Sequence, residues 1–360
     1  MSRTILIMAG GTGGHVFPGL AVAEYFKQQG WHVVWLGTHA GMEAKLVAKQ
    51  GYDMAWVSFS GVRGKGALRF LLLPVQLLVA FWQSARAIFS HRPDVVLGMG
   101  GYVAFPGGMI ASLLNKPLVI HEQNSIAGLA NKVLAKLADR VLVAFPDAFG
   151  AAKIANQILT GNPVRSDIAA IARPEARYGN RTGKLRLLVV GGSLGARVLN
   201  ATVPQALALL PAVDRPIVTH QSGEHHFAVL KEEYARAGVE ARVEAFIDNM
   251  ARAYAESDLV ICRAGALTVA EIAAAGIASI LVPYPHAADD HQTYNARFLA
   301  DRGAAWLLPQ SKLSPRALAD LLQGLNREKL LESARRAREL GKPDATRLVA
   351  QQCMELAHAA

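Results

Sequence analysis

The sequence predicts an α/β protein made of two Rossmann-like domains, each built on a doubly wound parallel sheet. Three observations predict this class. Short apolar runs alternate with amphipathic helical patterns, the alternation stops and restarts once, and a glycine-rich loop follows the first apolar run of each half. The 360 residues also exceed what one ordinary core holds and are enough for two domains.

The first half contains five apolar runs with the length and composition of buried strands, at residues 4–8, 33–36, 95–97, 118–120 and 141–143. Helical patterns fill most of the intervals, at residues 20–29, 104–114 and 129–137. Strands that are joined through helices run parallel and are covered on both faces. This half therefore predicts a parallel sheet between two helical layers.

The second half begins after a polar stretch around Pro174, Gly179 and Gly183, which predicts a linker. The alternation then restarts with strands at residues 185–190, 217–219, 259–262 and 278–282 and a first helix at 196–210. Residues 315–360 have a helical pattern that is broken at 341–343. We therefore place the domains at residues 1–164 and 165–342.

The charge distribution is uneven. The net charge is +10, and no acidic residue lies between Asp53 and Asp94, a stretch that holds Arg63, Lys65, Arg69, Arg86 and Arg92. Such a block indicates an anionic partner, namely nucleic acid, a phosphate-bearing ligand or a membrane surface, but an ordinary solvated basic face has the same composition. The neighbouring apolar run, residues 70–82, is too short to span a membrane and long enough to enter its interface.

Cysteine usage and the N-terminus predict a cytoplasmic protein. The two cysteines, Cys262 and Cys353, form no zinc or redox motif, which favours a reducing compartment. The first ten residues form a short apolar strand without the basic start and cleavage site of a signal peptide.

Three glycine-rich loops each follow a predicted strand and precede a helix: the first at residues 10–15, the second at residues 191–195 and the third at residues 98–102. Glycines allow a ligand to approach the backbone, and the free amides of a helix start suit an anion. Any one of them could be a turn without a ligand. None has the G-x-G-x-x-G pattern of dinucleotide sites, and no P-loop sequence is present, since Gly64-Lys65 is followed by Gly66.

Three polar clusters follow other strands. Residues 121–124 (His-Glu-Gln-Asn) suit a polyhydroxylated ligand or cap the next helix. Residues 263–271 begin a helix whose amides suit a phosphate or sugar, with Glu271 within reach of a ribose or merely favouring the helix dipole. Residues 286–295 predict a helix start with sugar-binding amides, because neither a zinc spacing nor a D-x-D magnesium motif is present. No metal or other cofactor is therefore expected.

His15 is the best candidate for acid–base chemistry, because histidine titrates near neutrality and this one stands beside a glycine loop at a helix start. A plain helix-entry residue is the alternative.

Taken in order, these motifs resemble those of the MurG family of bacterial cell-wall N-acetylglucosaminyltransferases over nearly the whole chain. The matching segments are residues 10–19, 121–124, 161–165, 191–193 and 266–271. The resemblance implies a GT-B fold, with two Rossmann-like domains facing a deep cleft. It also implies inverting β-1,4 transfer of N-acetylglucosamine from UDP-GlcNAc to lipid I, which makes lipid II for peptidoglycan synthesis.

The resemblance also implies roles for the domains. Residues 1–164 would bind the acceptor and the membrane, residues 165–342 would bind UDP-GlcNAc, and a C-terminal helix at 343–360 would pack back on the first domain. The implied donor-site residues are Thr12, Gly13, Gly14, Asn124, Arg165, Ser193, Ile247, Ala266, Leu267, Thr268, Val269, Ala270, Glu271, Gln292 and Asn295. Among them, Ile247 would hold the uracil through its backbone.

For the chemistry, His15 is the predicted base, with Glu122 and Tyr102 as lesser candidates. The acceptor diphosphate is expected at Gly13, Gly14, Gly100, Gly101 and Tyr102. An anionic membrane is expected at a patch formed by Arg69, Phe70, Leu73, Leu77, Phe81, Trp82 and Arg86, although a buried amphipathic helix is the alternative. Other cell-wall and division proteins are further expected partners, at the cytoplasmic face of the inner membrane.

Two other functions remain open. A UDP-GlcNAc 2-epimerase would share the fold and the donor, but it would need neither the third glycine loop nor the basic apolar segment. A nucleic-acid-binding protein would account for the charge, but the chain has no helix-turn-helix, zinc finger or aromatic-rich RNA motif, so no nucleic-acid partner is expected.

Overall fold

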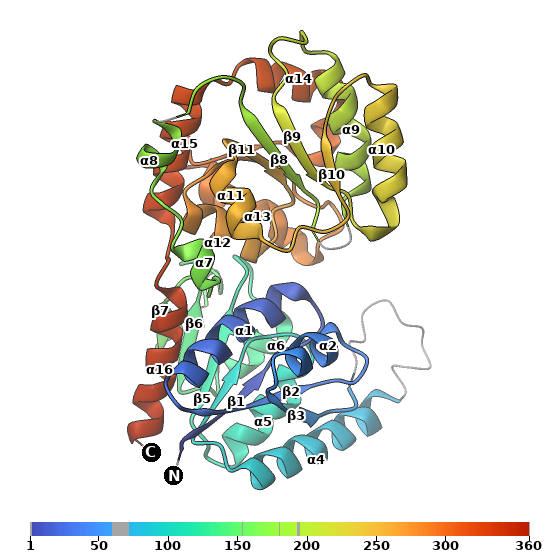
Figure 1. Ribbon diagram of the computed structural model, residues 1–360. Coiled ribbons are helices and arrows are strands. Elements are labelled where there is room, and N and C mark those ends of the chain that lie inside the picture. Colours follow the sequence, from blue (N-terminus) through green and yellow to red (C-terminus); the bar gives the residue numbers. More distant parts are fainter. Residues whose placement is uncertain (1, 60–71, 153, 180, 193–194, 360) are drawn as a thin grey trace. The chain divides into compact units, whose positions relative to one another are not determined.

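The computed structural model describes residues 2–59, 72–152, 154–179, 181–192 and 195–359. The chain forms two compact units, shown in Figure 1. Unit 1 comprises residues 1–165 and 343–360, and unit 2 comprises residues 166–342. The predicted boundary after residue 164 lies one residue from this division.

Unit 1 is built on a seven-stranded sheet with the order β3-β2-β1-β4-β5-β6-β7, in which every pair is parallel. The strands are β1 (Thr4–Met8), β2 (His32–Gly37), β3 (Asp53–Trp56), β4 (Val95–Gly98), β5 (Leu118–Glu122), β6 (Arg140–Val143) and β7 (Gln157–Leu159). The strand order reverses between β1 and β4, and ligands of such sheets bind at the carboxyl ends of these two strands.

Helices cover both faces of this sheet. The side chains of Leu6 and Met8 face α4 (Leu73–His91), α5 (Ala104–Leu113) and α6 (Leu129–Leu134). Those of Ile5 and Ile7 face α1 (Gly13–Gln28), α2 (Met42–Lys49) and α16 (Ala345–Ala359). The alternation of buried side chains along β1 thus divides the core of unit 1 into two layers.

Unit 2 repeats this plan with six parallel strands in the order β10-β9-β8-β11-β12-β13. The strands are β8 (Arg186–Val190), β9 (Ile217–Gln221), β10 (Arg242–Glu244), β11 (Leu259–Cys262), β12 (Ala278–Leu281) and β13 (Trp306–Leu307). The predicted α/β class with two parallel sheets is therefore confirmed.

Most helices of unit 2 flank this sheet. The helices α9 (Arg197–Ala208), α10 (Phe227–Arg236), α14 (Pro315–Gln323) and α15 (Arg327–Leu340) pack on one core face. Figure 1 shows α11 (Met250–Glu256) and α13 (His291–Ala300) on the opposite side from α9 and α10. The remaining helices are α12 (Ala266–Ala275), α7 (Ser166–Ala169), α8 (Pro174–Tyr178) and the short 3-10 turns η1 (Glu224–His226), η2 (Ala288–Asp290) and η3 (Gln310–Lys312).

The predicted linker around Pro174 is wrong. The segment contains α7 and α8, and α8 packs against α15. Tyr178 is buried, and its hydroxyl donates to the carbonyl oxygen of Asp258 at 2.7 Å. Arg177 is also buried, and it donates to the carbonyl oxygens of Ala275 and Gly276. The segment has a polar composition because its side chains bind backbone carbonyls inside unit 2.

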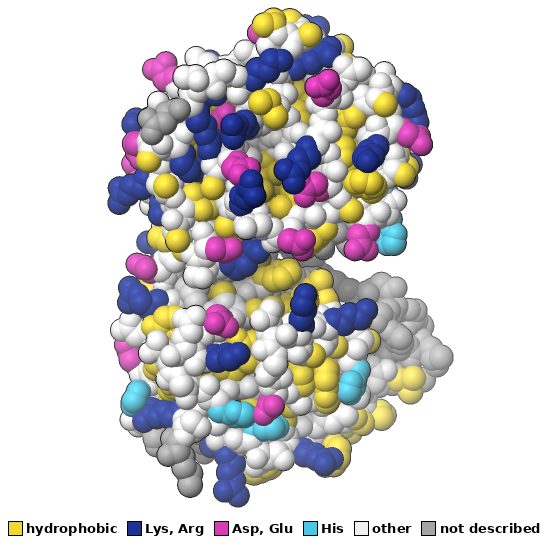
Figure 2. All heavy atoms as spheres, viewed as in Figure 1, with side chains coloured by type: hydrophobic (Ala, Val, Ile, Leu, Met, Phe, Trp, Pro, Cys, Tyr) yellow, Lys and Arg dark blue, Asp and Glu magenta, His cyan; other side chains and the backbone are white. Residues whose placement is uncertain are grey.

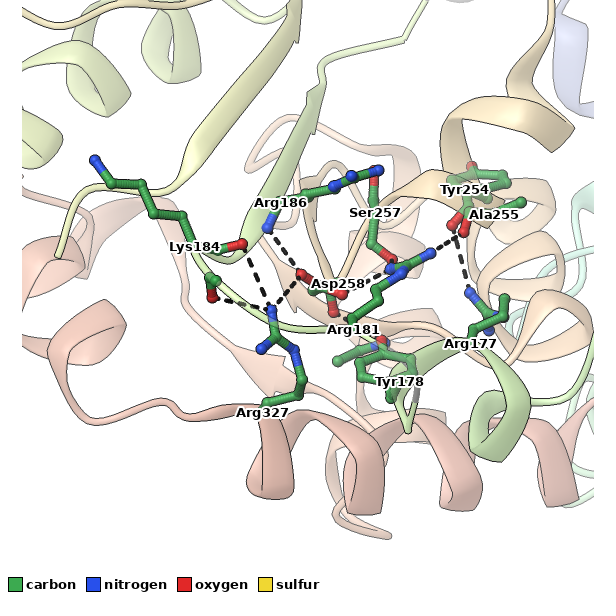
Figure 3. A network of polar contacts seen from close by, with 12 residues as sticks. Arg177, Tyr178, Arg181, Lys184, Arg186, Tyr254, Ala255, Ser257, Asp258 and Arg327 are labelled. Carbon is green, nitrogen blue, oxygen red and sulfur yellow. Dashed lines mark hydrogen bonds and ion pairs between the residues drawn. The ribbon is translucent and has the colours of Figure 1, made fainter. Parts of the chain in front are cut away.

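Asp258 is the centre of this polar network, which is drawn in Figure 3. Its carboxylate is fully buried and pairs with Arg181 at 2.6 Å and with Arg327 at 3.4 Å. It also accepts the backbone N–H of Arg186 at 2.9 Å, at the start of β8. The network therefore joins α8, β8, β11 and α15 at the end of the sheet opposite the glycine loops.

Candidate functional site

In unit 1, the first and third glycine loops lie side by side because β1 and β4 are neighbours in the sheet. The backbone N–H of Met99 donates to the carbonyl oxygen of Met8 at 2.8 Å. A Cβ atom on Gly101 would lie 2.1 Å from the carbonyl oxygen of Gly10, and Gly101 has a φ of +79°. Glycine is required here by both conformation and space. Two of the three loops predicted from the sequence therefore form one surface of unit 1.

The helix α1 begins inside the first loop, earlier than the predicted start at residue 20. Thr12 is its N-cap residue and provides no side-chain cap, and the first turn holds no acidic residue. An uncapped helix start with an unopposed dipole favours an anion. His15 lies in this first turn and is half-buried. Gly13, Gly14 and His15 thus all lie in the first turn of α1.

A buried carboxylate that sequence reasoning missed organises the first loop. Glu43 of α2 is fully buried, and it accepts the backbone N–H of Thr38 at 3.0 Å and the Thr38 hydroxyl at 2.8 Å. It also accepts the N–H of Gly11 at 3.3 Å. The hydroxyl oxygen of Tyr102 lies 3.4 Å from the Thr38 hydroxyl oxygen, and the ring of Tyr102 lies beside Gly11. The only sequence signal for Glu43 is its place in the first turn of the helix that follows a strand.

The side chains of residues 121–124 have two kinds of partner. Gln123 contacts the glycine loops of unit 1, and Glu122 binds the loop in which it stands. Both carboxylate oxygens of Glu122 are occupied, because it accepts from the backbone N–H of Asn124 at 2.9 Å, the N–H of Gly128 at 3.1 Å and the amide of Asn131 at 2.8 Å. Glu122 is also buried. This arrangement favours a structural role for Glu122 over that of a base. Asn124 remains half-buried at the end of the cluster.

In unit 2, the predicted donor residues 266–271 form the start of α12, and Asn295 lies next to it. Gly265 is the N-cap residue of this helix and provides no side-chain cap, so the start of residues 266–271 again suits an anion. Glu271 is buried and accepts from the hydroxyl of Tyr254 at 3.2 Å. Asn295 is fully buried and donates to the carbonyl oxygen of Ala264 at 3.2 Å. Two predicted sugar or ribose ligands therefore also hold the protein's own backbone and side chains.

Gln292, the remaining predicted sugar ligand of unit 2, is half-buried in α13, and its side-chain oxygen accepts the backbone N–H of Tyr284 at 2.9 Å. Arg165 is the last residue of unit 1 before the division, and it is half-buried. Ser193 lies outside the residues that the structure describes.

Gln221, which the sequence did not single out, connects Ile247 to the second glycine loop. Its side-chain oxygen accepts the backbone N–H of Ile247 at 2.9 Å, and its side-chain nitrogen donates to the carbonyl oxygen of Gly192 at 2.9 Å. Because the N–H of Ile247 already donates to Gln221, the backbone carbonyl oxygen of Ile247 is the group left to accept a hydrogen bond from the uracil of the nucleotide.

Ile247 also borders a groove of about 1060 Å³ in unit 2. The floor of the groove is the sheet face on which Leu188, Thr219 and Arg242 are neighbours across β8, β9 and β10. The helix that follows β10, α11, has 7 residues, and its Arg252 and Ala253 also line the groove. Figure 2 shows basic and acidic side chains interspersed on this side of unit 2.

The predicted membrane patch falls largely on α4, and its residues divide between two faces. Leu73 and Leu77 are partly buried against the core, and Phe81 packs against Phe105. Trp82 is 62 % exposed, and the Arg86 guanidinium lies 5.9 Å from the centre of its ring. Arg69 and Phe70 lie outside the described residues.

The outward face of α4 also exposes Val75, Leu78 and Val79, with Leu72 just before the helix, all within the apolar run 70–82, and Phe89, which lies beyond that run. In the described part of the chain, no helix is both long enough and apolar enough to cross a bilayer. The same residues include no group of three or more His, Cys, Asp or Glu side chains placed to hold a metal ion.

Comparison with known proteins gives two family matches along the chain. Residues 5–143 match the glycosyltransferase family 28 N-terminal domain, and residues 186–349 match the family's C-terminal domain. Two similar relatives come from Nitrosospira multiformis, with 63% identity over 99% of both chains, and Dechloromonas aromatica, with 60% identity over 99% of this chain and 100% of the relative. Both are named UDP-N-acetylglucosamine–N-acetylmuramyl-(pentapeptide) pyrophosphoryl-undecaprenol N-acetylglucosamine transferase.

Solved structures give the same picture. MurG from Acinetobacter baumannii has a TM-score of 0.85 and 42% identity, covering 98% of this chain and 99% of that one. A UDP-N-acetylglucosamine 2-epimerase structure from Listeria monocytogenes has a TM-score of 0.64 over 99% of this chain and 97% of that one, with 14% identity. The second likeness shows the fold alone, so the fold by itself does not distinguish a transferase from an epimerase.

Proposed function

Because the chain belongs to glycosyltransferase family 28, we propose that it transfers N-acetylglucosamine from UDP-GlcNAc to the muramoyl 4-hydroxyl of lipid I. The observation that carries this proposal is the identity of 63% over 99% of a transferase named for this reaction. The product is lipid II with a β-1,4 linkage, and the anomeric centre of the sugar inverts.

The chemical step is a direct displacement. The acceptor oxygen forms a bond to C1 of N-acetylglucosamine while the bond from C1 to the UDP oxygen breaks, and UDP leaves with the electron pair. The hydroxyl proton passes to a base, for which we propose His15 at the start of α1. The charge that develops on the leaving diphosphate is stabilised by the amides at the start of α12, where Ala266 to Glu271 bind the donor.

The remaining predicted contacts belong to the same proposal. The acceptor diphosphate binds the paired loops of unit 1 at Gly13, Gly14, Gly100, Gly101 and Tyr102. The apolar face of α4 holds the enzyme at the cytoplasmic surface of an anionic membrane, where its lipid acceptor lies. Other cell-wall synthesis and division proteins are proposed partners at that surface.

The decisive experiment incubates the chain with labelled UDP-GlcNAc, with and without a short-chain lipid I analogue. We expect label to enter the analogue and no consumption of UDP-GlcNAc without it. Acceptor-independent conversion of the sugar nucleotide would contradict the proposal and favour a 2-epimerase. In the same assay, His15→Ala should lower kcat by about 10²-fold or more. A variant with near-normal turnover would remove His15 from the role of base.

A further inference from the structure

We propose that Gln123 is a positioning residue that holds the His15 imidazole in the tautomer protonated at Nδ1, through a chain of hydrogen bonds that begins at the carbonyl oxygen of Gly161. The catalytic consequence rests on the proposed role of His15 as the base, but the tautomer itself does not. All the residues linked by these hydrogen bonds belong to unit 1.

The first step fixes the tautomer of His121. Its Nε2 atom lies 2.9 Å from the carbonyl oxygen of Gly161. A carbonyl oxygen can only accept, so Nε2 carries the hydrogen. His121 is fully buried, and burial lowers the pKa of its imidazole to about 4, so the ring is neutral near pH 7. Its Nδ1 atom therefore presents a lone pair.

The second step fixes the orientation of the Gln123 side-chain amide. One end of this amide lies 3.0 Å from His121 Nδ1 and 2.7 Å from the carbonyl oxygen of Met99. Both of these atoms are acceptors, so this end must be the NH₂ group, because an oxygen in its place would face two lone pairs. Gln123 is buried. Its backbone carbonyl oxygen accepts from the side-chain amide of Asn162 at 3.0 Å, which anchors the backbone at this residue.

The third step transfers this orientation to His15. The other end of the amide, Oε1 of Gln123, lies 3.0 Å from His15 Nδ1. Since Oε1 can only accept, Nδ1 of His15 must carry a hydrogen, and the lone pair of the neutral ring is then on Nε2. When Nε2 takes a proton, the hydrogen bond from Nδ1 to Gln123 is retained.

Gly100 makes room for this contact. A Cβ atom at residue 100 would lie 2.8 Å from His15 Nδ1 and 3.2 Å from Gln123 Oε1, and the φ of Gly100 is +93°. The third glycine loop therefore leaves space for the hydrogen bond that orients the proposed base.

The test measures the tautomer directly on the full chain, by ¹⁵N NMR of selectively labelled histidine at neutral pH, with His15 assigned from His15→Ala. We expect the wild-type His15 to be protonated at Nδ1. Gln123→Met preserves the length of the side chain and removes its donor and acceptor, so the Nδ1–H tautomer should lose its predominance. Its kcat should fall about 10-fold while the KM for UDP-GlcNAc stays unchanged.

The matched control is Gln28→Met, because Gln28 lies on the exposed end of the same helix as His15 and its side chain binds only Glu24 among the described residues. The control should keep the wild-type tautomer and kcat. A wild-type His15 protonated at Nε2 would overturn the inference without any variant. Retention of the Nδ1–H tautomer and normal kcat in Gln123→Met would also overturn it.

These outcomes separate the inference from the proposed function. If His15→Ala keeps its turnover while Gln123→Met alters the tautomer, the base assignment fails and the positioning of the ring by Gln123 stands. If His15→Ala loses turnover while Gln123→Met changes neither quantity, the positioning role fails and the base assignment stands.

Discussion

At the scale of single residues, the two units each keep one histidine neutral by burial. His121 accepts from Gln123 and donates to a backbone carbonyl, and His220 lies between the Tyr234 hydroxyl and Asn200. Burial lowers the pKa of His121 to about 4 and that of His220 to about 3. A cost of this arrangement is that both rings stay mostly neutral in the folded state near pH 5, whereas both are mostly protonated in the unfolded chain.

The sign of the resulting pH dependence follows from linkage. The folded pKa of His121 lies below the unfolded value of 6.5. The free energy of unfolding of unit 1 is therefore fully retained above about pH 6.5 and decreases as the pH falls toward 4, because the unfolded chain binds a proton that the folded chain does not. We expect the free energy of unfolding of unit 1 to decrease by about 3 kcal/mol over this range from His121 alone. Urea unfolding at a series of pH values measures this change.

The chain offers a selective probe for this measurement. Four of the five tryptophans, Trp31, Trp35, Trp56 and Trp82, belong to unit 1, so Trp306→Phe leaves fluorescence that reports on unit 1 only. In that background, His121→Gln should flatten the pH dependence, whereas His358→Gln, at an exposed histidine of unit 1, should leave it unchanged. An equal slope in all three proteins would show that His121 does not carry the effect.

Sequence reasoning singled out the residues of the candidate site that stand in local motifs and missed residues that contact them from elsewhere in the chain. The loop residues 10–15 were predictable because glycines and a helix start are adjacent in sequence. Glu43 and Gln221 were not, since each binds a glycine loop that lies far from it in the chain. Gln123 stood in a predicted motif, but its contact with His15 spans 108 positions and depends on the order of the strands.

At the scale of elements, the central strands were predictable and the outer ones were not. The central strands β1, β4 and β8 are almost continuously buried and therefore apolar throughout. The outermost strands β3, β7, β10 and β13 are two to four residues long and only partly buried, so their composition carries little signal.

The helix α4 shows why apolar composition alone could not decide between core and membrane. Its inward residues pack on the sheet, yet Leu78 is 68 % exposed and Trp82 is 62 % exposed. Large apolar side chains gathered on one exposed face indicate an interaction site. Arg86 adds positive charge beside them.

We expect Leu78→Ser combined with Trp82→Ser to weaken binding to phosphatidylglycerol-containing vesicles by at least 10-fold, because about 2 kcal/mol of apolar contact is lost. Vesicle co-sedimentation measures this change. Thermal stability should change little, since both side chains are exposed in the free protein. The matched control is Val213→Ser combined with Val229→Ser in unit 2, where the two valines are 75 % and 56 % exposed.

Charge gives a second, independent readout of the same face. Arg86→Glu should weaken binding to anionic vesicles and leave the weak binding to neutral vesicles unchanged. If the α4 double variant sediments with anionic vesicles to the same extent as the wild type and the unit 2 control, α4 is not the membrane-binding element.

At the scale of the whole molecule, the order of the chain and the division into units do not coincide. Unit 2 is one continuous segment, whereas unit 1 is completed only by α16 at the end of the chain. Val349, Ala350 and Cys353 are fully buried in the same core layer as α1 and the β1 side chains Ile5 and Ile7. The side chain of Arg140 also donates to the carbonyl oxygen of Gln352 and pairs with Glu355.

Ending the chain at residue 342 should therefore unfold unit 1 and leave unit 2 folded. The buried face of α16 contributes roughly 5 kcal/mol or more by burial of its apolar side chains, which is comparable to the total stability of a domain. Hydrogen exchange followed by mass spectrometry should show loss of protection in β1 and β4 and normal protection in β8 and β11. A full-length Gln351→Ala variant, with its substitution on the exposed side of α16, should keep protection in all four strands. If truncation removes protection equally from both sheets, the two units do not fold independently, and if it removes protection from neither, α16 is dispensable to the core of unit 1.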